Sequence, residues 1–303
     1  MVPLIKKLCC SLWGFLPVIM TAQTSLEKAS LNQVTFVSPY YFGPNAFPIP
    51  DMSDGTTSKT LHVESYGDVY AGKRGDYTVD LSLKAIIPLW TNRANLSVWM
   101  PVREWYWNTE ENISTCRVDD DYRIEAQNGH LAGDVYVSLE MQLFQQETSI
   151  FDGVIRSVLK TASGGGYHIA RYYDCPGYYF DAALSKSFSV LSGELRLGVS
   201  SGFLCWQTDN GRQNDAIMYG VMFKYKHNHI AASYVFGGYS GWENNIKDGG
   251  EFAHDCPMSH KLYFAWKFSR WDIFMYYQKG IRDYPFTQIR FGIARNFDLL
   301  SKH

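Results

Sequence analysis

The chain of 303 residues carries a formal net charge of -2 at pH 7, and 19% of its residues are charged while 16% are aromatic. Such a chain lacks the strongly basic surface that nucleic-acid recognition calls for, which excludes a nucleic-acid partner. The sequence has no low-complexity tract, short repeat or charged tail, so one folded domain accommodates the part that follows the N-terminal signal.

The start of the chain has the pattern of an export signal. Lys6 and Lys7 form a positive region, Leu8 to Met20 form an apolar one, and Ala22 is a small residue at a cleavage site. The apolar stretch is shorter than the ~20 residues that a spanning helix needs. We therefore expect a signal peptide over residues 1–22, with an uncleaved anchor as the alternative.

Residues 23–59 precede the first expected strand. Within them, Ser38 to Pro50 (SPYYFGPNAFPIP) is rich in proline and aromatic residues. Proline cannot donate a hydrogen bond to a ladder, so this stretch is not a central strand. Two placements remain open for this periplasmic or plug segment. We favour an ordered cap that packs its aromatic rings on the base of a barrel, and the alternative is a plug threaded into the lumen.

The remainder of the chain reads as β-structure. Alternation of apolar and polar residues predicts twelve strands, an even number as bacterial single-chain barrels have. The weakest prediction is 153–162, which also reads as a helical turn and follows a long connection at 145–152. The predicted strands cover 60–71, 76–90, 94–106, 131–144, 153–162, 178–189, 193–206, 216–226, 229–238, 260–268, 271–278 and 287–297.

The connections between these strands alternate in length. Those at 91–93, 191–193, 227–228 and 269–270 are short, and those at 108–130, 207–215, 239–259 and 279–286 are longer. This asymmetry predicts an all-β fold, a transmembrane antiparallel up-and-down barrel of about 12 strands with short periplasmic turns and long extracellular loops. Aromatic residues near strand ends fit the girdles of such a barrel. A secreted soluble β-sandwich that binds glycans is the rival fold.

On the barrel model, the polar face of the strands lines the lumen. Charges of both signs lie on neighbouring strands and can pair. A salt-bridged interior is therefore one reading, and a conduit for a small polar solute, with a mild excess of base that favours anions, is the other. The lumen-lining candidates are Asp80, Lys84, Arg103, Asp134, Glu140, Arg156, Lys160, Asp181, Glu194, Arg196, Lys224, Lys261, Lys267 and Arg290.

Four cysteines follow the signal, and all fall on the side of the long loops: Cys116, Cys175, Cys205 and Cys256. An even number in an exported protein favours disulfides or thiols with a structural role. Histidines lie near two of them, at His168, His254 and His260. No CxxC spacing supports zinc, so we expect no metal site and no cofactor.

Evidence for catalysis is thin, and the chain leans away from an enzyme. Ser163 with His168 or His254 is the one nucleophile–base pair that the loops offer, and no GxSxG elbow accompanies it. The triplet Asp119-Asp120-Asp121 supplies oxygen ligands for a hard cation, yet a solvated acidic turn is the favoured reading of it.

The whole chain resembles the uncharacterised outer-membrane β-barrels of Bacteroidota. The resemblance is carried by the signal ending in TAQ, the segment SPYYFGPNAFPIPD, the loop KTASGGGYHIARYYDCPGYYF and a last strand that ends on Phe297. It implies a barrel over residues 60–297 with a tail at 298–303, in the cell outer membrane of a Gram-negative bacterium. The partners it implies are outer-membrane lipid and lipopolysaccharide and the barrel-assembly machinery.

Twelve-stranded barrels as a class include porin-like channels, a phospholipase and a lipid A deacylase, and fold does not choose among them. The first expectation is a porin-like channel or transport protein for a small polar solute. A closed structural or interaction barrel with surface-exposed loops is the alternative, and an outer-membrane lipid hydrolase is the second alternative.

Overall fold

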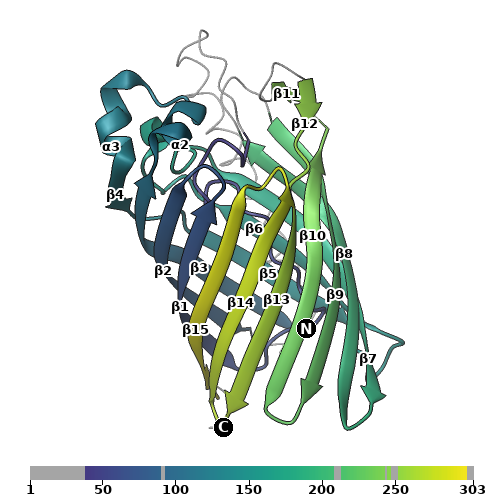
Figure 1. Cartoon of the computed structure of the whole chain (residues 1–303). Helices are drawn as coiled ribbons and strands as arrows, with labels where there is room; N and C mark the ends of the chain where they lie inside the picture. The colour runs from purple at the N-terminus through teal and green to yellow at the C-terminus, as the bar shows by residue number, and fades with distance from the viewer. Residues whose placement is uncertain (1–37, 90–92, 208–212, 243, 247–251, 299–303) are drawn as a thin grey trace, which may run out of the picture.

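A computed structural model describes residues 38–89, 93–207, 213–242, 244–246 and 252–298, and it shows a closed antiparallel barrel (Figure 1). Each strand pairs with its neighbours in the barrel, and β1 pairs with both β2 and β15, which closes the ring. The predicted barrel of 12 strands is confirmed. The barrel strands are β1 Leu61–Gly72, β2 Asp76–Pro88, β3 Ala94–Asn108, β5 Tyr136–Phe144, β6 Asp152–Lys160, β7 Gly177–Val190, β8 Gly193–Gln207, β9 Gln213–His227, β10 Ile230–Gly241, β13 Met258–Phe268, β14 Trp271–Arg282 and β15 Phe286–Phe297.

The two ends of the barrel differ, as the connection lengths predict. One end, called the short-turn end below, carries tight hairpins whose first loop residues Leu191, Asn228 and Ser269 have positive φ angles of 50 to 55°, as close-linked antiparallel strands require. It also carries the longer turn 145–151, which leads into β6, so the doubtful segment there is a strand.

The opposite end, called the long-loop end, carries the connections 109–135, 161–176 and 242–257. Short elements fold within these connections, which the strand-based sequence reading did not predict. They are α2 Glu110–Thr115, η2 Asp120–Tyr122, α3 Arg123–Gln127, β4 Asn128–Leu131, η3 Tyr167–Ile169, β11 Asn244–Ile246 and β12 Phe252–His254.

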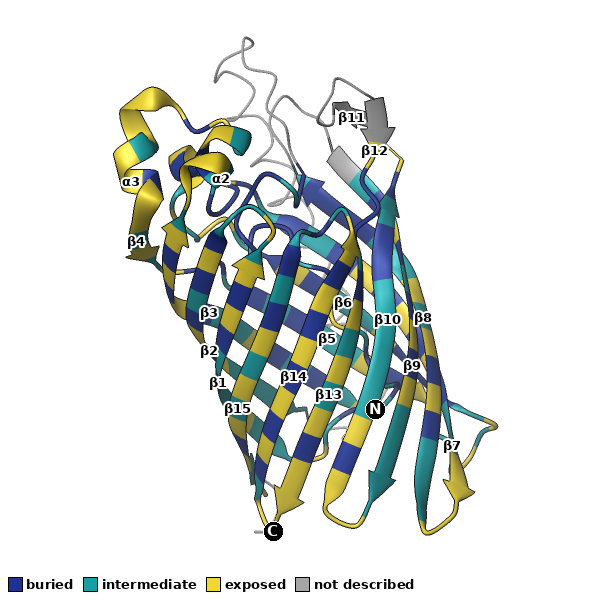
Figure 2. Ribbon diagram, in the orientation of Figure 1, coloured by how far each residue is buried: buried dark blue, intermediate teal, exposed yellow. Residues whose placement is uncertain are grey.

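The barrel is apolar outside and polar inside. Exposed and buried residues alternate along the strands (Figure 2), and the exposed ones on the strand faces are largely aliphatic or aromatic. Leu83 is 47% exposed, Val199 55% and Phe291 60%. A soluble protein does not expose a continuous apolar belt of this kind, so this surface faces lipid and the soluble sandwich is excluded. Exposed rings near the strand ends include Tyr77, Trp105 and Trp107 at one end and Phe144, Phe188, Phe268 and Phe297 at the other.

Among the described residues, no helix is long and apolar enough to cross a membrane.

A β-bulge in β3 overturns one lumen prediction. The register between β2 and β3 places Leu81 opposite Arg103 and Ser82 opposite Pro101, so Val102 is an extra residue. The extra residue reverses the alternation beyond it. Arg103 therefore points outward and is exposed, while Glu104 points inward and is completely buried.

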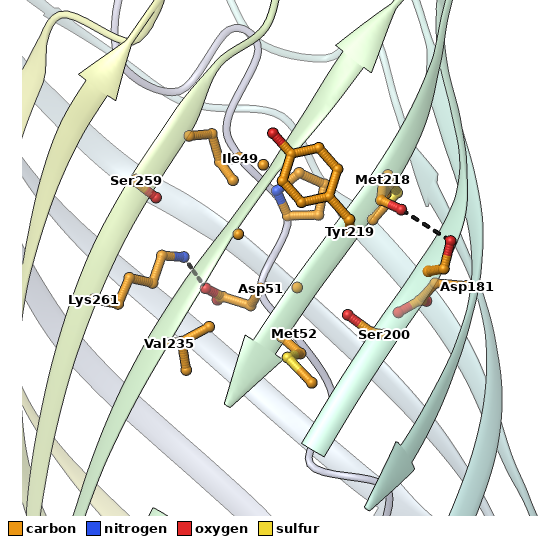
Figure 3. Close-up of a pocket in the computed structure, with 15 residues that line it drawn as sticks. Ile49, Asp51, Met52, Asp181, Ser200, Met218, Tyr219, Val235, Ser259 and Lys261 are labelled. Carbon is orange, nitrogen blue, oxygen red and sulfur yellow. Dashed lines mark hydrogen bonds and ion pairs between the residues drawn. The ribbon is translucent and has the colours of Figure 1, made fainter. Parts of the chain in front are cut away.

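Residues 38–59 run through the inside of the barrel, so the expected cap on its base is wrong. Ser38 Oγ donates to Asp255 Oδ1 at 2.8 Å in a loop of the long-loop end. Midway, Asp51 contacts Lys261 of β13, and Figure 3 shows this stretch of chain passing between the strands. Ser58 then contacts Thr60 immediately before β1 at the short-turn end. We call residues 38–59 the plug. The predicted signal peptide at 1–22 lies outside the described residues.

Candidate functional site

The long-loop end of the lumen is built around one buried arginine. Arg171 comes from the loop between β6 and β7, and only 1% of it is exposed. Its Nη1 donates to Asp76 Oδ2 at 2.8 Å, and its Nε and Nη2 donate to Glu104 Oε1 at 2.9 and 2.6 Å. Burial disfavours the charge, but the carboxylates of Asp76 and Glu104 outweigh it and raise the pKa of Arg171 above its usual range. The guanidinium therefore binds the loop to β2 and β3.

The plug docks on this arginine cluster. Gly43 N donates to the Ala170 carbonyl at 2.9 Å, and a Cβ on Gly43 would lie 2.8 Å from Arg171 Cζ. Two residues further on, Asn45 Nδ2 donates to Asp80 Oδ2 at 2.6 Å and to Glu104 Oε2 at 2.8 Å. Glycine is needed for this close approach, and the asparagine amide supplies hydrogen bonds to two buried carboxylates.

An aromatic layer surrounds the plug at the same level. Phe42 packs edge-on against Phe47 and Tyr173, with ring centroids 5.5 and 5.3 Å apart, and Phe47 packs on Trp206 at 5.9 Å. Tyr284 and Phe286 pack together at 5.4 Å on the far side. The layer draws buried side chains from β1, β5, β6, β7, β8, β9, β10 and β15. Together with the arginine cluster on β2 and β3, it packs around the plug at the long-loop end of the lumen.

Below this layer the plug is held mostly by charged and polar contacts. Asp54 Oδ2 accepts from Lys224 Nζ at 2.6 Å, and Ser53 Oγ donates to Glu140 Oε1 at 2.5 Å. Met52 fills a space left by glycines, since a Cβ on Gly220 would lie 3.0 Å from its Sδ. Asp51, Met52 and neighbouring strands enclose a pocket of about 20 Å³ (Figure 3), which is room for one water molecule.

Many of the predicted lumen charges are paired on the inner wall. Arg290 binds Asp68 through two hydrogen bonds of 2.7 Å. Other pairs, given as nitrogen–oxygen distances, are Arg156–Asp181 at 2.9 Å, Lys160–Asp134 at 2.5 Å, Arg196–Asp152 at 2.9 Å and Lys267–Asp272 at 3.5 Å. Glu194 accepts from Ser187 Oγ at 2.6 Å near the short-turn end. Thus the predicted charges other than Arg103 lie inside the barrel.

A cavity of about 590 Å³ lies between the plug and the barrel wall, and all twelve barrel strands contribute to its lining. Its lining reaches His62, Lys267 and Asn296 at the short-turn end, and it ends at Tyr136 and Tyr284 beneath the aromatic layer. We call this cavity the vestibule, and its lining residues extend from the aromatic layer toward the short-turn end. Lys84, Glu140 and Arg156 are among the predicted residues that line it.

The structure gives the four cysteines as thiols, with no disulfide among the described residues. Cys116 caps the C-terminus of α2, and burial raises the pKa of its thiol to about 12. No cluster of three metal-ligating side chains occurs in the described part of the chain. The loop staples that the even count favoured are thus absent from this structure, and thiols are the form it shows.

The suggested nucleophile and base have separate partners. Ser163 Oγ lies 2.8 Å from Thr161 Oγ1, whereas His168 Nε2 lies 3.1 Å from Glu125 Oε1. No hydrogen bond joins Ser163 to His168 in the described structure. Asp119 accepts from the Asp121 amide and caps η2, which is the solvated acidic turn that the sequence favoured.

Sequence reasoning missed Asp76, Glu104 and the role of Arg171. Asp76, Glu104 and Arg171 are not among the predicted lumen-lining residues. A mid-strand proline at 101 is the one signal that pointed to the bulge turning Glu104 inward.

No protein-family model matches the sequence, and a search of curated proteins finds no match. Solved structures similar to the model include the NanC porin, at 13% identity and a TM-score of 0.49, covering 78% of this chain and 100% of the other. The translocator domain of the autotransporter NalP from Neisseria meningitidis is 9% identical with a TM-score of 0.43, covering 80% of this chain and 90% of that one. The transport unit of AIDA-I from Escherichia coli is 8% identical with a TM-score of 0.44, covering 91% and 96%.

At these identities and TM-scores the three likenesses carry no argument about what this chain does. The closed ring of strands, the apolar exterior and the polar interior define the present chain as a β-barrel of the outer-membrane type.

Proposed function

We propose that the protein is a closed interaction barrel of a Gram-negative outer membrane, anchored by its strands and sealed by its own plug. Short turns face the periplasm in this proposal, and the long loops face the outside. The observation that carries it is the plug itself, because residues 38–59 occupy the lumen where a porin-like channel needs an open path. The Bacteroidota origin stays a prediction from the sequence.

The strength of the upper seal supports closure. Arg171 joins loop, wall and plug in one buried cluster, and removing either partner of a buried ion pair costs several kcal/mol. The aromatic rings of Phe42 and Phe47 are packed inside the barrel, at 7% and 3% exposure. Opening the lumen would expose these rings and separate these charges, so the sealed state is the stable one.

The long-loop end offers the surface for a partner. The helices α2 and α3 extend above the strands there (Figure 1). Ile124 of α3 is 83% accessible, and Tyr122 of η2, two residues before it, is 42% accessible. Tyrosine is among the residues enriched in protein interfaces relative to the rest of the surface.

Conductance in a planar bilayer tests the closed reading. We expect the refolded protein to insert without conducting, and a variant lacking residues 39–56 to conduct. Heat-modifiable mobility on a gel verifies that both proteins form a barrel. Steady conductance of the intact protein would contradict closure.

A cross-link separates a fixed plug from a gated channel. Gly220 faces Met52, and a Cβ added there would lie 3.6 Å from Met52 Cγ, so cysteines at these two positions would face each other. We expect Met52→Cys with Gly220→Cys to cross-link without changing the silent behaviour, as mass spectrometry of the linked peptides would show. If the reduced double variant conducts and oxidation abolishes that conductance, the result would instead support a channel gated by the plug.

A further inference from the structure

We propose that the vestibule is a binding site for a small hydroxylated carboxylate, held by Lys84 and by the hydroxyl groups beside Trp99. The inference goes beyond closure of the lumen, because a binding site in the vestibule does not depend on whether the upper seal ever opens. Its volume of about 590 Å³ falls within the ~300–1,000 Å³ of small-molecule sites.

The site is set out by strand register. Lys84 of β2 pairs with Trp99 of β3, and Trp99 pairs with Tyr136 of β5. In the next row toward the short-turn end, Ile86 pairs with Ser97 and Ser97 pairs with Ser138. Neighbouring strands lie about 4.8 Å apart, so an ammonium, an indole and two hydroxyls lie within reach of one small molecule.

Lys84 differs from the lysines and arginines paired above. It lies directly opposite Glu64 across β1 and β2, but the Glu64 carboxylate contacts His62 Nε2 at 3.0 Å. The Lys84 ammonium instead lies 5.9 Å from the centre of the Trp99 ring. In the described structure it has no carboxylate within 4 Å, and it lines the vestibule. An anion entering the vestibule therefore meets a cation whose charge is not already neutralised by contact.

Trp99 is held rigidly for such a role. The Tyr136 ring stacks on it at 4.9 Å with an interplanar angle of 11°. The Tyr136 hydroxyl is buried without a hydrogen-bond partner in the described structure. The contribution of Tyr136 to the site is therefore the stacking of its ring on Trp99. The indole thus forms a fixed wall between the ammonium and the serine hydroxyls.

Of the charged side chains that line the vestibule, Lys84 and Glu140 are the two with no oppositely charged group within 4 Å in the described structure, and Glu140 fixes how a ligand lies. Glu140 also lines the vestibule, and its carboxylate accepts from Ser53 of the plug. A ligand carboxylate is repelled from that side and attracted to Lys84. Hydroxyl groups suit the other side, because they donate to Glu140 and exchange hydrogen bonds with Ser97 and Ser138. One carboxylate followed by several hydroxyls meets both requirements.

Titration calorimetry of the folded barrel in detergent tests the proposal with a matched pair of probes. Gluconate carries a carboxylate and hydroxyls, and sorbitol carries the hydroxyls alone. We expect gluconate to bind and sorbitol to bind at least tenfold more weakly, because a charge-assisted hydrogen bond is lost. Lys84→Gln should weaken gluconate binding at least tenfold and leave sorbitol unchanged. Ser97→Ala should weaken both probes.

Lys279→Gln is the control, since it removes the same charge from an exposed position on β14 outside the vestibule. Absence of gluconate binding, equal binding of the two probes, or equal losses in Lys84→Gln and Lys279→Gln would overturn the site. The outcome is separable from that of the bilayer experiment. A conducting barrel with Lys84-dependent binding overturns closure alone, and a silent barrel without binding overturns the site alone.

Discussion

Removal of Arg171 is the sharpest test of how the lumen is sealed. Arg171→Ala deletes four charge-assisted hydrogen bonds, two to Glu104, one to Asp76 and one to Thr78 Oγ1. It leaves two carboxylates that are at most 3% exposed without their cation. Breaking a buried ion pair from one side typically costs about 3–5 kcal/mol. We expect a loss of that size in the free energy of unfolding.

The measurement is urea unfolding of the barrel in lipid or detergent, followed by tryptophan fluorescence and by gel mobility. Arg123→Ala is the matched control, because Arg123 binds Glu110 at 2.7 Å with side chains that are 31% and 61% exposed. An exposed pair of this kind contributes at most about 1 kcal/mol. A triple variant with Arg171→Met, Asp76→Asn and Glu104→Gln should recover part of the loss, since no charge is left uncompensated.

Equal effects of Arg171→Ala and Arg123→Ala would refute the reasoning. So would a triple variant that is less stable than Arg171→Ala, because it would show that uncompensated charge is not the cause. Conductance in a planar bilayer is a further readout. Because the Arg171 cluster holds the plug, we expect Arg171→Ala to show brief channel openings.

Three further predictions concern the plug, a loop and the outer belt. Gly43→Ala should destabilise the barrel by about 1–3 kcal/mol in the same unfolding assay, because its Cβ would lie 2.8 Å from Arg171 Cζ and overpacking has costs of this order. Cys116 should react slowly with iodoacetamide at pH 8 and faster as the pH rises toward its pKa of about 12, since the thiolate is the reactive form; rapid labelling at pH 8, measured by mass spectrometry, would contradict its burial. Leu83→Arg should cost about 2–4 kcal/mol, as a charge on the lipid face does, whereas a cost near zero would argue against a membrane belt at this 47% exposed residue.

The strands could be predicted because their signal is local. In β2, apolar Val79, Leu81 and Leu83 alternate with polar Asp80 and Ser82, and a period of two specifies both the strand and its faces. The tight turns between strands are local as well. Closure into a barrel then follows from physics, since twelve strands with one apolar face have no other way to satisfy their edges in lipid.

The bulge in β3 shows where local reasoning fails. Treating the strand as regular places Arg103 inside, because it stands an even number of residues from Trp99. One inserted residue, Val102, reverses the faces beyond it. After the bulge, Glu104 faces the lumen, and its neighbours Arg103 and Trp105 both face outward. A single-residue shift exchanges every side chain between lumen and lipid, so the key carboxylate was missed.

The position of the plug could not be read from its own residues, because the base of a barrel and its lumen offer the same chemistry to it. A segment with Phe42, Phe47, Asn45, Asp51 and Asp54 satisfies its rings and carboxylates against either one. What decides is the wall, where the glycines Gly198 and Gly220 leave room for a chain inside the barrel. Lys224 on β9 and Lys261 on β13, two strands that β10 separates, contact the two plug carboxylates. These partners lie 170 and 210 residues away along the chain, so only the closed barrel brings them together. Most charged side chains of the lumen therefore hold the plug or pair on the wall. Lys84 contacts no carboxylate in the described structure, so it is the lumen lysine that we expect to bind a solute.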